Sequence, residues 1–464
     1  MAYNLLKSNR DQMYLMPLSM RDWLPDNHLA WFILDVVKEF DLTPFYRRYR
    51  ADGWGRAAYE PGMMVALLLY AYSLGIRSSR QIERACESDV AFRVITGNQK
   101  PDYSTICRFR KEFEAELGEL FTEVLRLCVE AGLVKVGVLA LDGTKVKGNT
   151  SLSANRTYEY LEKEVKQMLR EAEVKDAEED ALYGEDRRGD ELPESLAHRE
   201  SRLARLKEAK AQLEQQAQEK ARAQKEKIEA RAVEESTMGK KRRGRKPKPP
   251  NEAPDRRAKA NLTDLESRIM KTSNGYIQGY NAQAVVTSDQ VIVAAEVTQQ
   301  QNDVGQLHPM MNKASEELEA AGITQKMRVM LADAGYYSEE NVLKANPGGP
   351  ELLLATSRDH KQRQAMKKAT APRGRIPNKA TVKEMMERKL LTKRGKALYK
   401  LRSMTVEPVF GQIKEARCCN RFMRRGLTSA ISEWRLISAT HNLLKLWRSG
   451  KACLGSGCKK ICWA

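Results

Sequence analysis

The chain lacks any hydrophobic run that could cross a bilayer, because none approaches the roughly 20 apolar residues that a transmembrane helix needs. Residues 1–7 also lack the apolar core and the cleavage site of a signal peptide. These absences argue against an integral membrane protein and against a secreted precursor. We therefore expect a cytoplasmic protein with no membrane partner.

Paired C-x-x-C motifs are missing too, although the chain has eight cysteines. Some are scattered through helical sequence, where free buried thiols are common. Three others crowd the tail at uneven spacing, namely Cys453, Cys458 and Cys462. Because zinc sites usually pair their cysteines, no metal is expected in the tail.

Acidic residues are fewer than basic residues in this chain. The 464 residues include 80 Lys and Arg against 61 Asp and Glu, a formal charge of +19. Such an excess favours a polyanionic partner, with nucleic acid first and an anionic membrane second. The length is sufficient for two or three domains with a substantial core.

Residues 1–135 are predicted to be helical. Apolar or amphipathic helices are expected at 29–37, 63–70, 78–86 and 103–111, with a break at 97–101 and Pro61 opening the second. The last two helices would form a helix–turn–helix arrangement, with Ser104, Thr105, Arg108 and Lys111 on one exposed face. Such a face suits a DNA groove. An ordinary helical bundle with a solvated basic face fits equally well.

A charged segment then interrupts the chain. Residues 158–233 consist mainly of Glu, Lys, Ala, Gln and Arg with sparse Leu. Some of the leucines approximate a heptad, but Lys210 and Lys220 interrupt the seam. Two long charged helices, paired as an antiparallel hairpin, fit this pattern. A partly disordered insertion is the alternative.

The insertion ends in a polycation, residues 240–250, whose prolines favour an open chain. Arg243 and Arg245 flank a glycine, as in an AT-hook, but Lys246 stands where that motif usually has proline. Narrow minor grooves attract inserted arginines. Nonspecific phosphate binding is nevertheless the favoured interpretation.

Strand-like segments surround the insertion. They are expected at 136–141, at 275–286 and 291–297 as a hairpin with a turn at 288–290, at 327–333 and at 351–355. Helices are expected at 308–321 and 381–400, around Glu407, and around Trp434 and Trp447. This order predicts an α/β fold with a mixed sheet.

Three carboxylates stand beside apolar segments. Asp142 and Asp333 each end a strand-like run, and Glu407 lies among apolar residues. Thr405 is expected to cap a helix that has Pro408 in its first turn. Glu407 would then share a helical face with Phe410 and Lys414.

Buried carboxylates need compensation, and two-metal phosphoryl transfer uses carboxylates to hold two Mg²⁺ ions. The three acids therefore predict a metal site acting on a phosphodiester. Asp142 and Asp333 could instead belong to simple turns. Asp303 and Glu296 are competing acids that could also face the site, whereas Asp289 is expected to point to solvent.

Several ordered motifs resemble those of bacterial insertion-sequence DDE transposases. They occupy residues 141–145, 279–283, 297–303, 332–336 and 406–414, and residues 61–64 and 104–106 are similar to an InsH-like transposase N-terminal domain. The resemblance implies a ribonuclease H-like fold. It also implies that Asp142, Asp333 and Glu407 are catalytic and bind Mg²⁺, for which Mn²⁺ is a possible substitute.

The related Tyr–Arg–Glu–Lys signature would comprise Tyr399, Arg402, Glu407 and Lys414. One residue more than the signature expects separates Arg402 from Glu407. Arg402 and Lys414 are cations near a metal-binding acid, so both could bind phosphates. A plain surface lysine is the alternative for Lys414. Further expected DNA contacts are Tyr399, Lys145, Arg108, Arg243 and Arg245.

The expected architecture is a helical DNA-binding domain, an α/β ribonuclease H-like domain with flanking helices, and a charged helical insertion. The corresponding ranges are 1–135, 136–155 continued by 271–450, 156–270 for the insertion, and 451–464 for the tail. The implied activity is hydrolytic nicking at insertion-sequence ends, followed by attack of the freed 3′-hydroxyl on target DNA. No covalent protein–DNA intermediate is expected.

The implied partner is double-stranded DNA, both terminal repeats and target, bound by a homodimer at the bacterial nucleoid. One alternative is a catalytically inactive, transposon-derived DNA-binding protein or repressor. Another, a coiled-coil interaction protein, depends only on the insertion.

Overall fold

A computed structural model describes most of the chain. The described residues are 19–49, 57–168, 170, 194–239, 247–272, 275–357, 368–370, 374 and 380–451. Arg243, Arg245 and the three tail cysteines lie outside them. Within the described part, no helix combines the length and the apolar composition that a membrane crossing requires. The cysteines at 86, 107, 128, 418 and 419 are free thiols.

The N-terminal part is helical, as predicted. Its helices are α1 (Leu29–Lys38), α2 (Thr43–Tyr46), α3 (Pro61–Ser73), α4 (Ser79–Ser88), α5 (Val90–Ile95), α6 (Tyr103–Glu112) and α7 (Glu114–Glu130). Helix α3 is almost entirely buried and begins at Pro61, where no backbone N–H is needed. Glu60 caps it by accepting the N–H of Gly62 at 3.0 Å.

Helices α4 and α6 are packed together. Asp102 caps α6 by accepting the backbone N–H of Thr105 at 2.8 Å. Ser104, Arg108 and Lys111 are exposed and Thr105 is half-buried. The predicted polar face of α6 is therefore present.

A mixed sheet forms the centre of the molecule. Its strands are β1 (Val138–Lys147), β4 (Arg268–Thr272), β5 (Gly275–Thr287), β6 (Ile292–Thr298), β7 (Val329–Ala332) and β8 (Glu351–Leu354). They lie in the order β4-β5-β1-β7-β8, and β6 also pairs with β5. Strand β1 is antiparallel to β5 and parallel to β7, which is parallel to β8. The predicted α/β class and mixed sheet are confirmed.

Strand β1 is longer than predicted. The apolar run was expected to end at Asp142, with a turn at Asp142–Gly143 as the alternative, but the strand continues to Lys147. The extension is stabilised by β5, whose residues pair with β1 from Leu139 to Lys147. Asp142 therefore lies within a strand, and the turn interpretation is wrong.

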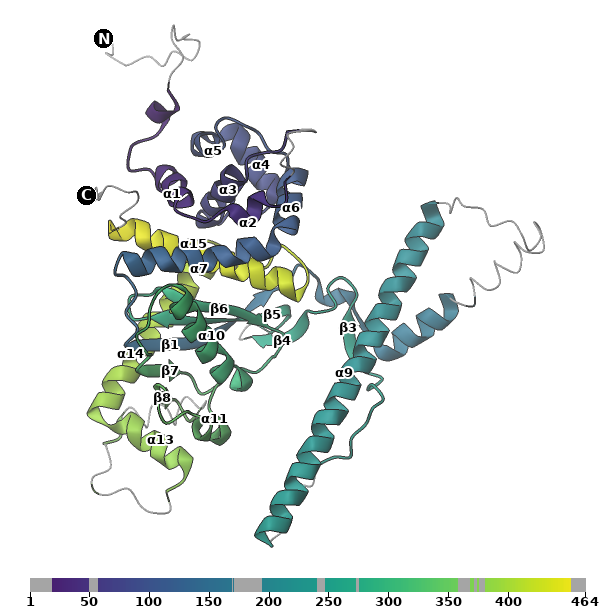
Figure 1. The fold of residues 1–464 in the computed structure, drawn as a ribbon. Coiled ribbons are helices and arrows are strands. Elements are labelled where there is room, and N and C mark those ends of the chain that lie inside the picture. Colours follow the sequence, from purple (N-terminus) through teal and green to yellow (C-terminus); the bar gives the residue numbers. More distant parts are fainter. Residues whose placement is uncertain are drawn as a thin grey trace, which may run out of the picture.

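Among the described residues, further helices flank the sheet, namely α10 (Leu307–Ala320), α11 (Glu339–Leu343), α13 (Val382–Leu391), α14 (Lys393–Gly411) and α15 (Leu427–Ser449). Helix α15 lies along α7 and against β6, between the N-terminal helices and the sheet (Figure 1). Its Trp434 is fully buried and donates from Nε1 to the carbonyl of Gln283 at 2.9 Å. One hydrophobic core runs from the N-terminal helices through α15 to the sheet.

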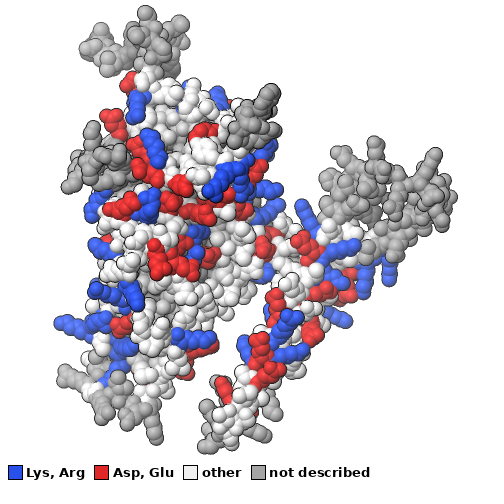
Figure 2. Space-filling model, viewed as in Figure 1, with Lys and Arg blue, Asp and Glu red and all other residues white. Residues whose placement is uncertain are grey.

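The charged insertion forms a helical arm, here defined as the helix at residues 158–168 together with α9 (Glu194–Met238). A small sheet of β2 (Asn155–Thr157) and β3 (Lys259–Asn261) lies at its base. The arm stands apart from the rest of the molecule in Figure 1, and Figure 2 shows both signs of charge mixed along it.

The two helices of the arm are antiparallel. Tyr158 donates to Glu214 at 2.8 Å, and Arg202 contacts Glu164 at 2.7 Å. A small apolar cluster lies between them, containing Leu161, Val165, Met168, Leu206, Ala209, Leu213 and Ala260. The predicted helical hairpin is confirmed for the described residues.

Candidate active site

Asp142 and Asp333 come together on two neighbouring strands. Because the parallel register of β1 and β7 pairs Leu141 with Ala332, the two aspartates follow side by side. Asp142 accepts the N–H of Gly143 at 2.8 Å, and Asp333 accepts the N–H of Gly335 at 2.7 Å. Adjacent parallel strands thus explain why acids 191 positions apart in sequence share one location.

Glu407 lies in a different part of its helix from that predicted. Helix α14 begins after Thr392, whose hydroxyl caps the helix by accepting the backbone N–H of Gly395 at 2.9 Å. Pro408 lies inside this helix rather than in its first turn. Thr405 is not a cap, because its hydroxyl donates to the carbonyl of Leu401 at 2.6 Å.

A tertiary contact compensates for the proline. Pro408 cannot donate to the carbonyl of Met404, one turn earlier. That carbonyl instead accepts a hydrogen bond from Nε2 of Gln290, in the turn between β5 and β6, at 3.1 Å. The helix therefore continues through Pro408, and Glu407 is near its C-terminal end.

Arg402 connects the acids. One guanidinium nitrogen lies 2.8 Å from Oδ2 of Asp142 and the other 3.2 Å from Oε1 of Glu407. The side chains of Asp142 and Arg402 are mostly buried, whereas that of Glu407 is 56% exposed. The additional residue between Arg402 and Glu407 does not prevent their contact.

Burial and charge act on these groups in opposite directions. Burial raises the pKa of Asp142 to about 6, with Asp333 adding to the rise and Arg402 opposing it. Burial disfavours the charged form of Arg402, but the combined attraction of Asp142, Tyr399 and Asp333 outweighs burial and raises the pKa of Arg402. The charged form of Asp142 therefore remains disfavoured despite its arginine partner.

Asp303 is at the centre of a second group. Its Oδ1 accepts from Asn281 at 2.6 Å and from Gln283 at 3.0 Å, and lies 3.3 Å from Nζ of Lys145. Asp142 and Asp333 also attract the ammonium of Lys145, so this second group neighbours the aspartate pair. Lys145 thus contacts Asp303, which the sequence suggested only as an alternative to the three candidate site acids.

Two glycines allow Asp303 to approach the aspartate pair. A Cβ on Gly335 would lie 2.8 Å from Oδ1 of Asp333 and 3.3 Å from Oδ2 of Asp303. A Cβ on Gly143 would lie 3.0 Å from Oδ1 of Asp303. Sequence reasoning missed these roles, although each glycine follows a site aspartate within two residues.

The remaining residues of the Tyr–Arg–Glu–Lys signature also lie along β1 and β7. Tyr399 donates to the carbonyl of Ala332, next to Asp333, at 3.4 Å. Lys414, in the π-helical segment Gln412–Ala416, donates to Thr144 at 3.1 Å and to the carbonyl of Lys145 at 3.3 Å. Burial lowers the pKa of Lys414, so it is not a freely solvated surface lysine.

The described residues include no group of three or more His, Cys, Asp or Glu side chains arranged to hold a metal ion. The arrangement does contain oxygen donors of the kind that Mg²⁺ prefers. Asp142 and Glu407 already share one cation, the guanidinium of Arg402. The donor set therefore fits a hard cation, provided that Arg402 moves aside.

Arg108, another predicted DNA contact, is not brought to this location. Arg108 is on the exposed face of α6, among the N-terminal helices, which α7 and α15 separate from the sheet (Figure 1). Among the competing acids, Asp289 lies 3.1 Å from Lys135 and is partly exposed, as expected.

Two segments of the chain match known domain families. Residues 18–112 match a transposase domain, DUF772, and residues 360–447 match a transposase DDE domain. The first segment includes α1–α6, and the second includes Glu407, Arg402 and Lys414. No curated protein matches the chain. No solved structure matches it either.

Proposed function

We propose that this chain, which carries the domains of an insertion-sequence DDE transposase, cuts DNA strands at insertion-sequence ends by metal-dependent hydrolysis and joins the 3′-hydroxyl ends to target DNA. The observation that carries the proposal is the contact of Arg402 with both Asp142 and Glu407, with Asp333 beside Asp142. Three acids from distant segments would not share one location by local sequence preference alone.

Asp142, Asp333 and Glu407 would hold the metal, Mg²⁺ or its substitute Mn²⁺. When bound, such ions activate the attacking water or hydroxyl and stabilise the leaving oxygen. The raised pKa of Asp142 supports this assignment, because burial and a neighbouring acid leave a carboxylate that gains from a nearby cation.

The cations have a different role in this proposal. Once Arg402 leaves the acids, it would bind a phosphate of the DNA strand, since a guanidinium forms two parallel hydrogen bonds to phosphate oxygens. Lys414 is held beside Thr144 on β1 and would bind a neighbouring phosphate. Tyr399 would position Asp333 through the carbonyl of Ala332.

A ribonuclease H-like core, DNA recognition by the face of α6 that includes Arg108, and a homodimer on DNA complete the proposal. The mixed sheet, with Asp142 on its central strand and Asp333 directly after the parallel neighbour, supports such a core. The site of action would be the bacterial cytoplasm, at the nucleoid.

The test is strand nicking by purified Asp142→Asn, Asp333→Asn and Glu407→Gln variants on duplexes carrying candidate terminal repeats. With Mg²⁺ or Mn²⁺ we expect nicking to fall at least about 1,000-fold, roughly 4 kcal/mol of transition-state stabilisation, while DNA binding persists. Asp289→Asn is the matched control and should nick normally. Undiminished nicking by one of the three variants would remove that residue from the catalytic set.

A DNA-binding protein without catalysis is the second candidate. The observation in its favour is that Arg402 already occupies Asp142 and Glu407. Wild-type protein that binds the duplexes but never nicks them, with either metal, would support this alternative.

A further inference from the structure

A second polar site lies away from the acids. A cavity of about 820 Å³ opens between the N-terminal helices and the beginning of α15. None of the three candidate catalytic acids lines it. The basic residues of its lining are Arg77, Arg80, Arg110, Lys111, Arg424 and Arg425.

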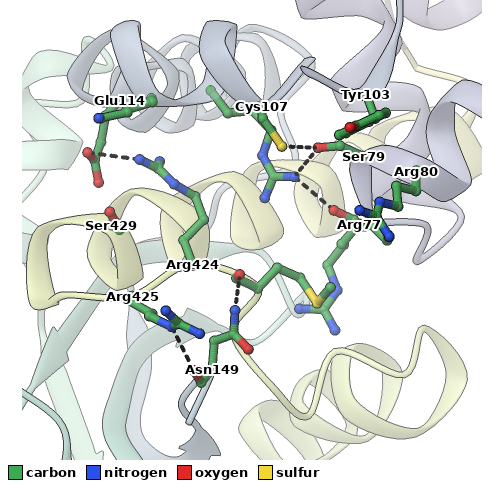
Figure 3. A pocket seen from close by; sticks show the side chains of 14 residues that line it. Arg77, Ser79, Arg80, Tyr103, Cys107, Glu114, Asn149, Arg424, Arg425 and Ser429 are labelled. Carbon is green, nitrogen blue, oxygen red and sulfur yellow. Dashed lines mark hydrogen bonds and ion pairs between the residues drawn. The ribbon is translucent and has the colours of Figure 1, made fainter. Parts of the chain in front are cut away.

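The lining is strongly positive. It includes six basic side chains but only one acid, Glu114, which lies 3.0 Å from Arg424. Figure 3 shows Arg77 and Arg80 on one side of the cavity and Arg424 and Arg425 on the other. A concave surface of one sign concentrates the opposite charge within it.

Arg77 is neutralised within the protein. It lies 3.1 Å from Glu433, which also accepts the backbone N–H groups of Met423 and Arg424. It also donates to the carbonyl of Cys418 at 3.1 Å. This arginine therefore holds the loop at residues 418–425 and has a structural role.

Arg110 is not neutralised in the same way. It is only 5% exposed, and one of its terminal nitrogens donates to neutral groups, the carbonyl of Arg77 at 2.9 Å and the hydroxyl of Ser79 at 3.2 Å. The other terminal nitrogen is buried without a hydrogen-bond partner, and no described acid forms an ion pair with Arg110. Its guanidinium lies over the ring of Tyr72 at 5.6 Å, and although burial disfavours its charge, attraction to Tyr72 and Glu433 leaves the pKa of Arg110 raised. Arg110 therefore stays charged, and an anion in the cavity would supply the partner that its second terminal nitrogen lacks.

The cavity also connects two parts of the molecule. Lys111 contributes from α6, the helix with the predicted DNA-binding face. On the opposite side, the loop at residues 418–425 is joined to the end of β1: the amide of Asn149 donates to the carbonyl of Met423 at 2.8 Å, and Arg425 donates to the carbonyl of Asn149 at 3.1 Å. Strand β1 also includes Asp142.

We propose that this cavity binds a backbone phosphate of the DNA held by the N-terminal helices, and so fixes that DNA relative to β1. The inference rests on the proposed function, in which DNA is the substrate. Guanidinium groups match the geometry of phosphate oxygens. Phosphate contacts fix position and register but read no sequence, so terminal-repeat and unrelated duplexes should use the cavity alike.

The experiment compares duplex affinity across salt concentrations. The double variant Arg80→Gln/Arg425→Gln removes two exposed cations of the lining that lie outside the predicted DNA-binding face of α6, so the fold should be retained. Each lost phosphate contact lowers the slope of log affinity against log salt by about 1. We expect a slope lower by about 2 and affinity lower by roughly 10- to 50-fold at physiological salt, on both duplexes.

The matched control is Lys38→Gln/Arg202→Gln, which removes the same charges from exposed positions outside the cavity. Arg110→Gln tests the buried cation directly. Because this variant could fail to fold, the exposed double variant alone decides the matter. A slope and affinity equal to those of the control would overturn the proposal.

Inorganic pyrophosphate, titrated by calorimetry, distinguishes DNA from a free anion. Micromolar pyrophosphate binding that the double variant loses, with unchanged duplex affinity, would identify a small-anion site and also overturn the proposal. Loss of nicking in Asp142→Asn, with unaffected binding in the double variant, would reject the cavity but keep the proposed function. Wild-type protein that neither binds nor nicks DNA would reject both.

Discussion

The acid group around Asp142 and the cavity around Arg110 are two charge clusters of opposite sign, both attached to residues 138–149. In the acid group the protein supplies its own counter-charge, since Arg402 contacts two carboxylates. In the cavity the hydrogen bonds of Arg110 go to neutral groups, and one terminal nitrogen has no hydrogen-bond partner among the described residues. In the proposed function, the first cluster would exchange its internal cation for a metal. In the proposed use of the cavity, the second cluster would receive a phosphate of the bound DNA.

The largest effect should come from titrating Asp142. Its carboxyl has a pKa of about 6 when folded, against an ordinary value of 3.8, so the folded protein holds an extra proton between these values. The free energy of unfolding of wild type, relative to Asp142→Asn, should therefore fall by about 2 kcal/mol as pH rises from 4 to 6. Denaturant unfolding of both proteins without divalent metal measures the difference. Parallel pH curves would contradict it.

A smaller effect is expected from removing the internal cation. In Arg402→Met, magnesium no longer has to displace a guanidinium from Asp142 and Glu407, so it should bind about tenfold more tightly. At saturating magnesium this corresponds to about 1.4 kcal/mol of additional stabilisation relative to wild type. Thermal unfolding with and without Mg²⁺ measures it, and Arg394→Met, on the same helix, is the control. Equal magnesium-induced shifts in all three proteins would show that Arg402 does not compete.

Removing the acid that opposes the cations of the cavity should have a weaker effect. Glu114→Gln removes the one acid of the lining and releases Arg424, so duplex DNA should bind about threefold more tightly at low salt. Fluorescence anisotropy with a labelled duplex measures this change. Glu123→Gln, on the same helix but outside the cavity, is its control. Weaker binding by Glu114→Gln would mean that the acid orders the cavity rather than opposing its ligand.

The smallest effect is expected in the arm. The Arg202–Glu164 pair is short, 2.7 Å, but its arginine is 60% exposed. Exposed pairs contribute little, so Glu164→Gln should change the free energy of unfolding by no more than about 0.5 kcal/mol and leave nicking unchanged. Denaturant unfolding and the nicking assay test both expectations. A loss above 2 kcal/mol would show that distance matters more than burial here.

The sequence predicted those features that depend on local pattern. Helices with clear starts, such as the one at Pro61, and apolar strands followed by an acid, such as the one before Asp333, were correctly identified. The hairpin at 275–297 and the helical arm follow from the same kinds of periodicity.

Features that depend on contacts between distant segments were not predicted. Pro408 was expected in a first turn because nothing nearby could replace its missing hydrogen bond, and the replacement comes from Gln290. The extent of β1 depends on pairing with β5, and the cavity depends on arginines from α6 and from the segment before α15. Hydrophobic periodicity and capping residues indicate local structure, so they do not predict contacts between distant segments.

The bond from Gln290 to the carbonyl of Met404 also limits how this protein can vary. The tip of a hairpin normally tolerates substitutions and insertions. Here Gln290 has a positive φ of 64°, and its own carbonyl accepts from His441 of α15 at 3.0 Å. An inserted residue in this turn would displace the support of α14 and α15 together, and Glu407 with them. Homologues should therefore keep the length of this exposed turn as strictly as they keep the acids.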